Sequence, residues 1–176
     1  IADVKVQFEA LLQNKLQINR TVTFEDVYQL TNKELHICAT NLSKREPVYF
    51  SHVTYPRMSV TDAVVMSMSI PLVFVKTVFE GDIYCDGCIT DSFPIKVFAD
   101  KNQKEVHGVY LNVESVSDHQ VDDIFQYLQG VVACFFKCPV HSENIYCIKT
   151  QNCHALEFDI SDTRINELFN EGLNLK

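Results

Sequence analysis

The chain has 176 residues, a length typical of one domain, and its five glycines and five prolines are too few for a linker or a disordered tail. Hydrophobic residues make up 47% of it and charged residues 22%, the profile of a compact protein. The formal net charge of −8 argues against a broad nucleic-acid-binding face, because such affinity comes largely from Lys and Arg at phosphates. No apolar run approaches the roughly 18 residues needed to cross a bilayer, which indicates a soluble or peripheral protein.

The seven cysteines are scattered over segments with helix and strand patterns. A chain of this size does not need disulfides for stability, so we interpret them as free thiols in a reducing compartment and expect a cytoplasmic protein. The chain begins with Ile1, and its first residues have neither the charge order nor the cleavage site of a signal peptide. We interpret this start as a point within a longer protein.

Two helices are predicted near the start of the chain. The first has apolar residues at a helical period, on one dry face: Val4, Phe8, Leu11, Leu12 and Leu16. Thr23, with Asp26 three residues later, predicts the N-cap of a second, short helix that runs through Tyr28.

The middle of the chain predicts strands on either side of a helix. Residues 34–42 alternate apolar and polar side chains, and 47–50 follow after a turn, which is typical of adjacent strands. Ser59 or Thr61 caps a helix that must end near Ile70, because Pro71 disfavours a helical residue before it. Residues 83–85 form a short strand that stops at the Asp86–Gly87 dipeptide, which favours positive φ and a sharp turn. Asp86 is therefore expected at the end of a strand.

The last third of the chain predicts a strand at 106–113 and a long helix that begins at Asp118. The helix has apolar residues at spacings of three and four: Val121, Ile124, Phe125, Leu128, Val131, Val132, Phe135 and Phe136. We expect it to face the core; the alternative is a lipid-facing helix. Two further strands are predicted at 145–148 and 156–160.

Ser161 and Asp162 cap a last predicted helix, which contains Ile165 and Leu168 and ends at Gly172. Strands that alternate with helices in this way favour a layered α/β fold around a mostly parallel sheet. We find no internal repeat and no linker-like change of composition.

Four segments of the chain carry a resemblance to a known family. SVTDAVVMSMSIPLVF ends a helix in a Ser-Ile-Pro step, and YCDGCITDSFPI contains an Asp-Gly pair at matching spacing. Both resemble the patatin-like phospholipase family, as do the upstream TFEDVYQLTNKELHICATNLSKREPVYFS and the downstream FDISDTRINELFNEGLNL. The resemblance covers about 23–175, which is nearly the whole chain.

The resemblance implies a three-layer α/β/α fold with a mostly parallel central sheet, in which 1–176 would form the C-terminal part of a single domain. In the family a serine on a Gly-x-Ser-x-Gly elbow attacks an ester carbonyl, and an aspartate takes its proton. Carried over to this sequence, Asp86 would be that base. The resemblance also implies no metal or cofactor, a phospholipid or other acyl-ester lipid as substrate, and peripheral contact with a membrane.

The residues around Asp86 suit this role with one exception. A carboxylate with an ordinary pKa near ~3.9 is a poor base unless burial raises it, and Ile83, Tyr84 and Ile89 are apolar neighbours. Gly87 would let the backbone turn and permit close approach. The family usually has Gly or Ala at the third motif position, where this chain has the larger Cys88.

The nucleophile is missing from the sequence. The five glycines are Gly81, Gly87, Gly108, Gly130 and Gly172, and no pair of them brackets a serine at the elbow's spacing. No glycine-rich loop is available to bind an oxyanion either. We therefore expect an N-terminal segment of the same protein to supply both, and an apolar groove beside the Asp86 strand to receive it. The alternative is a degenerate, non-catalytic domain of the family that binds lipid or a protein partner.

Other candidate residues have simpler interpretations. Asp86 would be an ordinary turn residue without the family context, and Asp62 and Asp91 are expected to be structural or solvated. Ser67 and Ser69 lie in a predicted helix, which lacks the strained turn that activates a nucleophile. His36, His52, His107 and His119 show no ligand spacing.

Zinc is the remaining alternative. Its candidate ligands are the pair Cys85 and Cys88 and a second group of Cys134, Cys138, His141, Cys147, Cys153 and His154. The first pair straddles Asp86 and the second group lacks a paired C-x-x-C. We therefore favour free thiols over an α/β domain with structural zinc.

Overall fold

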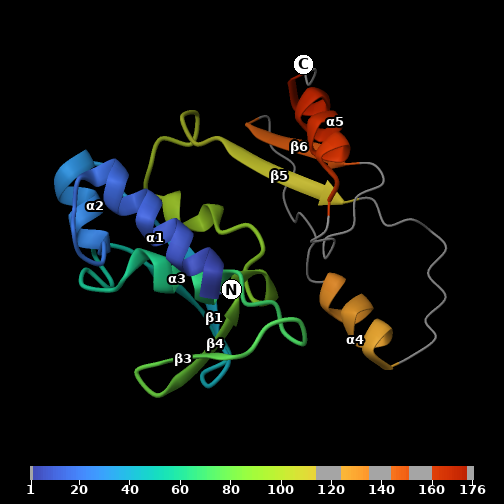
Figure 1. The fold of residues 1–176 in the computed structure, drawn as a ribbon, viewed down its shortest axis with the longest axis horizontal. Helices are drawn as coiled ribbons and strands as arrows, with labels where there is room; N and C mark the ends of the chain where they lie inside the picture. The colour runs from blue at the N-terminus through green and yellow to red at the C-terminus, as the bar shows by residue number, and fades with distance from the viewer. Residues whose placement is uncertain (1, 114–123, 135–143, 151–159, 174–176) are drawn as a thin grey trace.

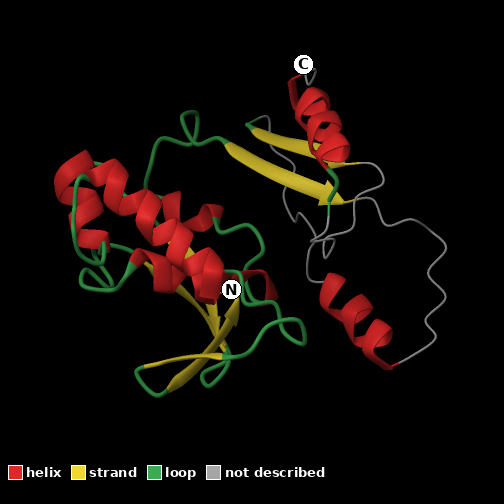
Figure 2. Cartoon of the chain, viewed as in Figure 1, coloured by secondary structure: helices red, strands yellow, loops and turns green. Residues whose placement is uncertain are grey.

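A computed structural model describes residues 2–113, 124–134, 144–150 and 160–173. Its helices are α1 (Ala2–Leu16), α2 (Phe24–Thr31), α3 (Val60–Ser67), α4 (Ile124–Ala133) and α5 (Asp162–Leu173), with 3₁₀ turns η1 (Gly87–Ile89) and η2 (Ile95–Phe98). Its strands are β1 (Ile37–Asn41), β2 (Glu46–Phe50), β3 (Thr77–Phe79), β4 (Asp82–Asp86), β5 (Gly108–Val113) and β6 (Ile145–Thr150). Helices and strands are mixed along the chain, which confirms the α/β class (Figures 1 and 2).

The larger sheet has the order β2-β1-β4-β3, and every neighbouring pair in it is antiparallel. The expectation of a mostly parallel sheet is therefore wrong for these strands. For the pairs β1–β2 and β3–β4 the reason is that residues 42–45 and residues 80–81 join them, and connections this short can link only antiparallel strands. Parallel pairing occurs between β5 and β6, which are separated by a long connection that contains α4.

The turn between β3 and β4 has positive φ at both of its residues, 50° at Glu80 and 85° at Gly81. Two such residues between paired Phe79 and Asp82 make a type I′ hairpin, whose twist matches that of the flanking strands. The alternation of apolar and polar residues did not predict β3. The available signal was Gly81, a turn residue directly before the predicted strand 83–85, which indicates that another strand precedes the turn.

The caps of α2 and α3 agree with the predictions. The Thr23 hydroxyl accepts the Asp26 N–H at 3.2 Å, and the Asp26 carboxylate accepts the Thr23 N–H at 3.0 Å, which makes a capping box. The helix then runs to Thr31, beyond the expected end. Ser59 caps α3 by accepting the Asp62 N–H at 3.2 Å.

The core lies between the larger sheet and its helices, where α3 packs on β1 and β4 and α1 crosses α3 (Figure 1). Its buried residues are Phe24, Ala39, Phe50, Met58, Val60, Ala63, Met66 and Tyr84. From α1, Phe8 and Leu12 pack against this core, whereas Val4 and Leu11 are exposed. The predicted dry face of α1 is thus confirmed only in part.

In α4 the apolar residues Ile124, Tyr127, Leu128 and Val131 are exposed, contrary to the expectation of a core-facing helix. The reason is that this helix lies apart from the larger sheet and its helices (Figure 1). Its predicted start at Asp118 and residues 156–159 of the predicted strand 156–160 lie outside the described residues, and Ile160 itself is not in a strand.

The start of α5 is confirmed. Ser161 caps it by accepting the Arg164 N–H at 3.3 Å, and the helix continues past Gly172 to Leu173. Among the helices that the structure describes, none is long and apolar enough to cross a membrane.

Candidate active site around Asp86

Asp86 is the last residue of β4, as the sequence predicts, and it pairs with Ala39 in the middle of the sheet. The residue is only 6% exposed. Its carboxylate therefore lies at the edge of the core, at the point where the chain leaves the sheet and enters η1.

Three elements hold Asp86 in this position. Its N–H donates to the Ser69 carbonyl after α3 at 2.9 Å, and its own carbonyl accepts the Thr40 hydroxyl of β1 at 2.8 Å. Its Oδ1 accepts the Cys88 N–H of η1 at 2.8 Å. The backbone N–H, the backbone carbonyl and the carboxylate each have a partner from a different part of the fold, so Asp86 has little freedom to move.

Glycine is required at position 87 because the backbone of β1 leaves no room for a side chain there. A Cβ at this position would lie 2.5 Å from the Cys38 carbonyl oxygen of β1, far inside van der Waals contact. The expected positive φ at Gly87 is wrong; among the described glycines, Gly81 has that conformation. The close approach expected of Gly87 is real, and its neighbour is the backbone of the adjacent strand.

Burial raises the pKa of Asp86 above its ordinary value, and hydrogen bonds from the Cys88 N–H and side chain oppose this effect. Burial is the larger cause, because a carboxylate loses most of its hydration in this position. A raised pKa makes the carboxylate a better proton acceptor at neutral pH than a solvated aspartate.

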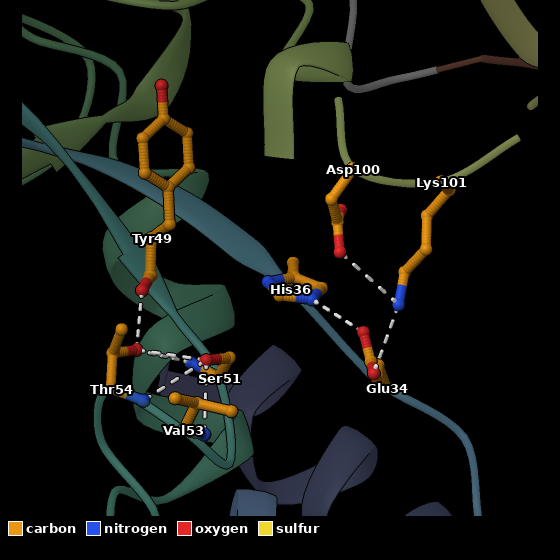
Figure 3. A network of polar contacts seen from close by, with 8 residues as sticks. All are labelled: Glu34, His36, Tyr49, Ser51, Val53, Thr54, Asp100 and Lys101. Atoms are coloured by element: carbon orange, nitrogen blue, oxygen red, sulfur yellow. Dashed lines mark hydrogen bonds and ion pairs between the residues drawn. The ribbon is translucent and has the colours of Figure 1, made fainter. Parts of the chain in front are cut away.

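Tyr49 of β2 fixes the segment that follows η1. Its hydroxyl donates to Asp91 Oδ2 at 2.5 Å, and Asp91 Oδ1 also accepts the Phe93 N–H at 3.3 Å. Burial, with Asp91 beside it, raises the pKa of the Tyr49 hydroxyl, which keeps it protonated as a donor. The Tyr49 carbonyl accepts the Thr54 hydroxyl at 2.7 Å, on the side opposite to its ring (Figure 3). Asp91 thus has structural contacts, as expected.

A second contact holds the same segment further along. Lys101, after η2, lies 3.4 Å from Glu34 and 3.9 Å from Asp100, and His36 lies 3.6 Å from the other Glu34 oxygen (Figure 3). Glu34, Asp100 and Lys101 are exposed to solvent at the surface, so their ion pairs contribute little to stability. They tie the chain after η2 to the residues just before β1.

Comparison with known proteins identifies the family. The sequence model for patatin-like phospholipases matches residues 8–99, which is more than half of the chain and includes Asp86. The chain belongs to this family. The match also covers α3, β4 and η1, the elements that position the Asp-Gly pair.

Two viral proteins are similar in sequence to this patatin-like chain. The uncharacterized protein R571 of Acanthamoeba polyphaga mimivirus is 34% identical over 106 residues, which cover 60% of this chain and 34% of that protein. The probable lipid hydrolase 463L of invertebrate iridescent virus 6 is 30% identical over 81 residues, covering 46% of this chain and 28% of that protein. The chain spans about a third of the length of these relatives.

VipD from Legionella pneumophila is similar in fold, with a TM-score of 0.64 and 19% sequence identity. The similarity covers 86% of this chain and 33% of VipD. At this level of identity the likeness supports the fold alone.

The patatin-like chain accommodates Cys88 at the motif position where a smaller residue was expected. Its N–H binds Asp86, and its side chain is partly buried. Burial first, and then the charge of Asp86, raise the pKa of Cys88 to about 12 and that of Cys85 to about 11. Both thiols are therefore protonated at neutral pH in the chain as described.

No group of three metal-ligating side chains occurs in the part of the chain that the structure describes. Four of the zinc candidates, Cys138, His141, Cys153 and His154, lie outside that part. The preference for free thiols agrees with the five described cysteines that are unpaired: Cys38, Cys85, Cys88, Cys134 and Cys147.

Neither serine near the end of α3, Ser67 or Ser69, has the geometry of a nucleophile. Ser67 is the last residue of α3, and Ser69 is 2% exposed with its hydroxyl donated to the Val65 carbonyl at 2.5 Å. Ser69 contributes instead through its carbonyl, which binds the Asp86 N–H. The sequence did not indicate this contact.

The contacts of the described histidines are with residues other than Asp86. His36 pairs with Glu34, His52 stacks on a tyrosine ring at 3.9 Å, and His107 stacks on Tyr146 at 6.3 Å. His119 lies outside the described residues. Each of the three has a different partner, and the buried Nδ1 of His52 has no hydrogen-bond partner among the described residues.

A surface hollow of about 600 Å³ lies at the other end of β4. It is lined mainly by residues 54–59, with Asp62, Phe79 and Glu80. Asp86 is not among them, so this hollow is not the apolar groove expected beside the Asp86 end of the strand, and that groove stays a prediction.

Proposed function

We propose that this patatin-like chain supplies the carboxylate of a Ser–Asp dyad in a lipid acyl hydrolase. The observation that carries the proposal is Asp86, a buried carboxylate at the end of β4 whose position is fixed by three hydrogen bonds and whose pKa is raised by burial. The family to which the chain belongs acts on phospholipids, which favours an acyl ester of a lipid as substrate.

In the proposed reaction a serine hydroxyl attacks the ester carbonyl while Asp86 takes its proton. The tetrahedral intermediate collapses to an acyl-serine, and the alcohol leaves with the proton from Asp86. Water then attacks the acyl-serine, again with Asp86 as base, and the serine oxygen leaves with the proton from Asp86 as the fatty acid is released. The serine and the carboxylate cover the roles of nucleophile and base, so the reaction needs no metal or cofactor.

Several features of the whole protein belong to this proposal. Residues 1–176 would be the C-terminal part of one patatin-like domain, with the serine elbow supplied by a segment of the same protein. The protein would act in the cytoplasm. It would contact membranes peripherally, because its lipid substrate is found in membranes. It would not bind nucleic acid, consistent with the net charge of −8.

Replacement of Asp86 in the full-length protein tests the proposal. Asp86→Asn keeps the size of the side chain and removes its basicity, so we expect kcat toward a short-chain p-nitrophenyl ester to fall by about 10²–10⁴-fold. Asp82→Asn, on the same strand, removes a carboxylate that binds Asn41 and Lys44 and should leave kcat near the parental value.

The outcomes separate the alternatives. Parental activity in Asp86→Asn would refute the role of Asp86. A parental protein that neither hydrolyses the ester nor reacts with a serine-directed fluorophosphonate would favour the non-catalytic domain that binds lipid or a protein partner.

A further inference from the structure

Two threonine hydroxyls connect the end of η1 with the backbone of Asp86. Thr40 lies in β1, is 1% exposed, and places its Oγ1 2.8 Å from the Asp86 carbonyl oxygen. The same Oγ1 lies 2.8 Å from Oγ1 of Thr90, the exposed C-cap residue that follows η1. One buried hydroxyl therefore contacts the residue before the turn and the residue after it.

The direction of both hydrogen bonds follows from the number of protons. A threonine hydroxyl has one proton to donate, and a carbonyl oxygen has none. Because the Asp86 carbonyl can only accept, Thr40 uses its proton there, and Thr90 must be the donor in the other contact. The chain of donors runs from Thr90 to Thr40 to Asp86, and each donor strengthens the next.

Thr40 contacts both ends of the η1 turn, which places the Cys88 N–H within hydrogen-bond distance of the Asp86 carboxylate. The Thr90 N–H closes this turn by donating to the Gly87 carbonyl at 3.2 Å, and Gly87 packs closely against the backbone of β1. If the Thr40 hydroxyl were lost, both ends of the turn would lose a contact at once. The Cys88 N–H and the carboxylate could then shift relative to each other.

We propose that Thr40, supported by Thr90, is a positioning residue for Asp86, which sets the orientation of the carboxylate through the backbone of Asp86 and the η1 turn. The expected effect of Thr40 on catalysis rests on the proposed function. The structural part of the inference concerns the geometry of Asp86 and Cys88 and is measurable without substrate.

The test compares Thr40→Val with Thr40→Ser in the full-length protein. Valine keeps the shape and removes the hydroxyl, so we expect kcat to fall roughly 10- to 100-fold with KM little changed, since displacement of a catalytic group by about 1 Å can cost about a hundredfold. Serine keeps the hydroxyl and should restore kcat to within about threefold of the parental value.

Thr61→Val is the matched control. Thr61 is also fully buried and donates its hydroxyl to a side chain, Glu9, but it has no contact with Asp86. This variant should lose stability to a similar extent without the fall in kcat. A loss of kcat in Thr61→Val equal to that in Thr40→Val would show a general effect of stability and overturn the proposal.

A second measurement separates this inference from the proposed function. The NMR shift and hydrogen exchange of the Cys88 amide report its bond to the Asp86 carboxylate. In Thr40→Val we expect faster exchange and an altered shift, and in Thr40→Ser the parental values. An unchanged Cys88 amide in Thr40→Val overturns the inference even if the protein is a hydrolase. A changed amide in a protein without esterase activity supports it and refutes the proposed function.

Discussion

Asp86 carries a charge that its surroundings stabilise poorly. The residue is 6% exposed, and its carboxylate accepts hydrogen bonds from the neutral Cys88 alone, from its N–H at 2.8 Å and from its side chain, among the contacts of the described residues. A buried carboxylate normally needs more partners or a positive charge nearby. Such a group lowers the stability of the folded chain, and proteins retain groups of this kind chiefly where they serve function.

The effect of Asp86 on stability should depend on pH. Because its pKa is raised in the folded chain, the folded state binds this proton more tightly than the unfolded state does. Its contribution is therefore most favourable below the unfolded pKa and is lost as the pH rises through the folded pKa. We expect Asp86→Asn to raise the free energy of unfolding at pH 7 and to have little effect at pH 4, measured by urea denaturation.

Asp26 provides the contrast in the same experiment. The hydrogen bond from Arg20 lowers the pKa of Asp26, so its contribution is present above the unfolded pKa and is lost as the pH falls. Asp26→Asn should therefore destabilise the chain at pH 7. The prediction for Asp86 is wrong if Asp86→Asn is the less stable protein at neutral pH.

Gly87 should not tolerate a side chain. In Gly87→Ala the new Cβ meets the Cys38 carbonyl, so β1 and β4 must separate, and we expect a loss of about 1–3 kcal/mol in the free energy of unfolding. Gly130→Ala is the control, because nothing lies within 4 Å of its Cβ position and alanine favours the helix. Guanidinium denaturation measures both, and equal stability of Gly87→Ala and the parent would contradict the prediction.

The local elements of the chain are the ones that the sequence predicted best. The capping box at Thr23 and the N-cap at Ser59 depend on side chains within three residues of each other, and both formed as expected. The alternation in residues 34–42, followed after a turn by residues 47–50, also predicted two adjacent strands. These signals are short-range, so they do not depend on the rest of the fold.

The turn from β3 to β4 is an element whose sequence is not optimal. Glu80 has a φ of 50°, a conformation that costs an ordinary L-residue about 1–2 kcal/mol and that asparagine tolerates better. We expect Glu80→Asn to raise the free energy of unfolding by about 0.5–1 kcal/mol. Glu80→Gln, which removes the charge and keeps the strain, should leave it unchanged. Thermal unfolding measures the difference, and equal midpoints for the asparagine and glutamine variants would refute the explanation.

At the scale of the whole molecule, the described residues fall into a well-packed group and a group with exposed apolar side chains. The larger sheet buries its core against α1 and α3, whereas α4 exposes Ile124 and Val131 and α5 exposes Phe169. The parallel pair β5–β6 also exposes Val109 and Tyr146, although parallel sheets are usually covered on both faces. The helical spacing of apolar residues predicted α4 correctly. That spacing does not specify which other part of the fold, if any, covers the apolar face of the helix.

The sequence by itself determined the family, the α/β class, most helix and strand positions, and Asp86 as the residue at the end of its strand. Each depends on residue types at fixed short spacings, which act locally or survive as a motif. The direction of the larger sheet, the reason for Gly87, and the contacts of Ser69 and Thr40 with Asp86 were decided only by the tertiary structure. These contacts join residues far apart in the chain, for example Thr40 and Asp86 across β1 and β4, and no local pattern encodes such a pairing.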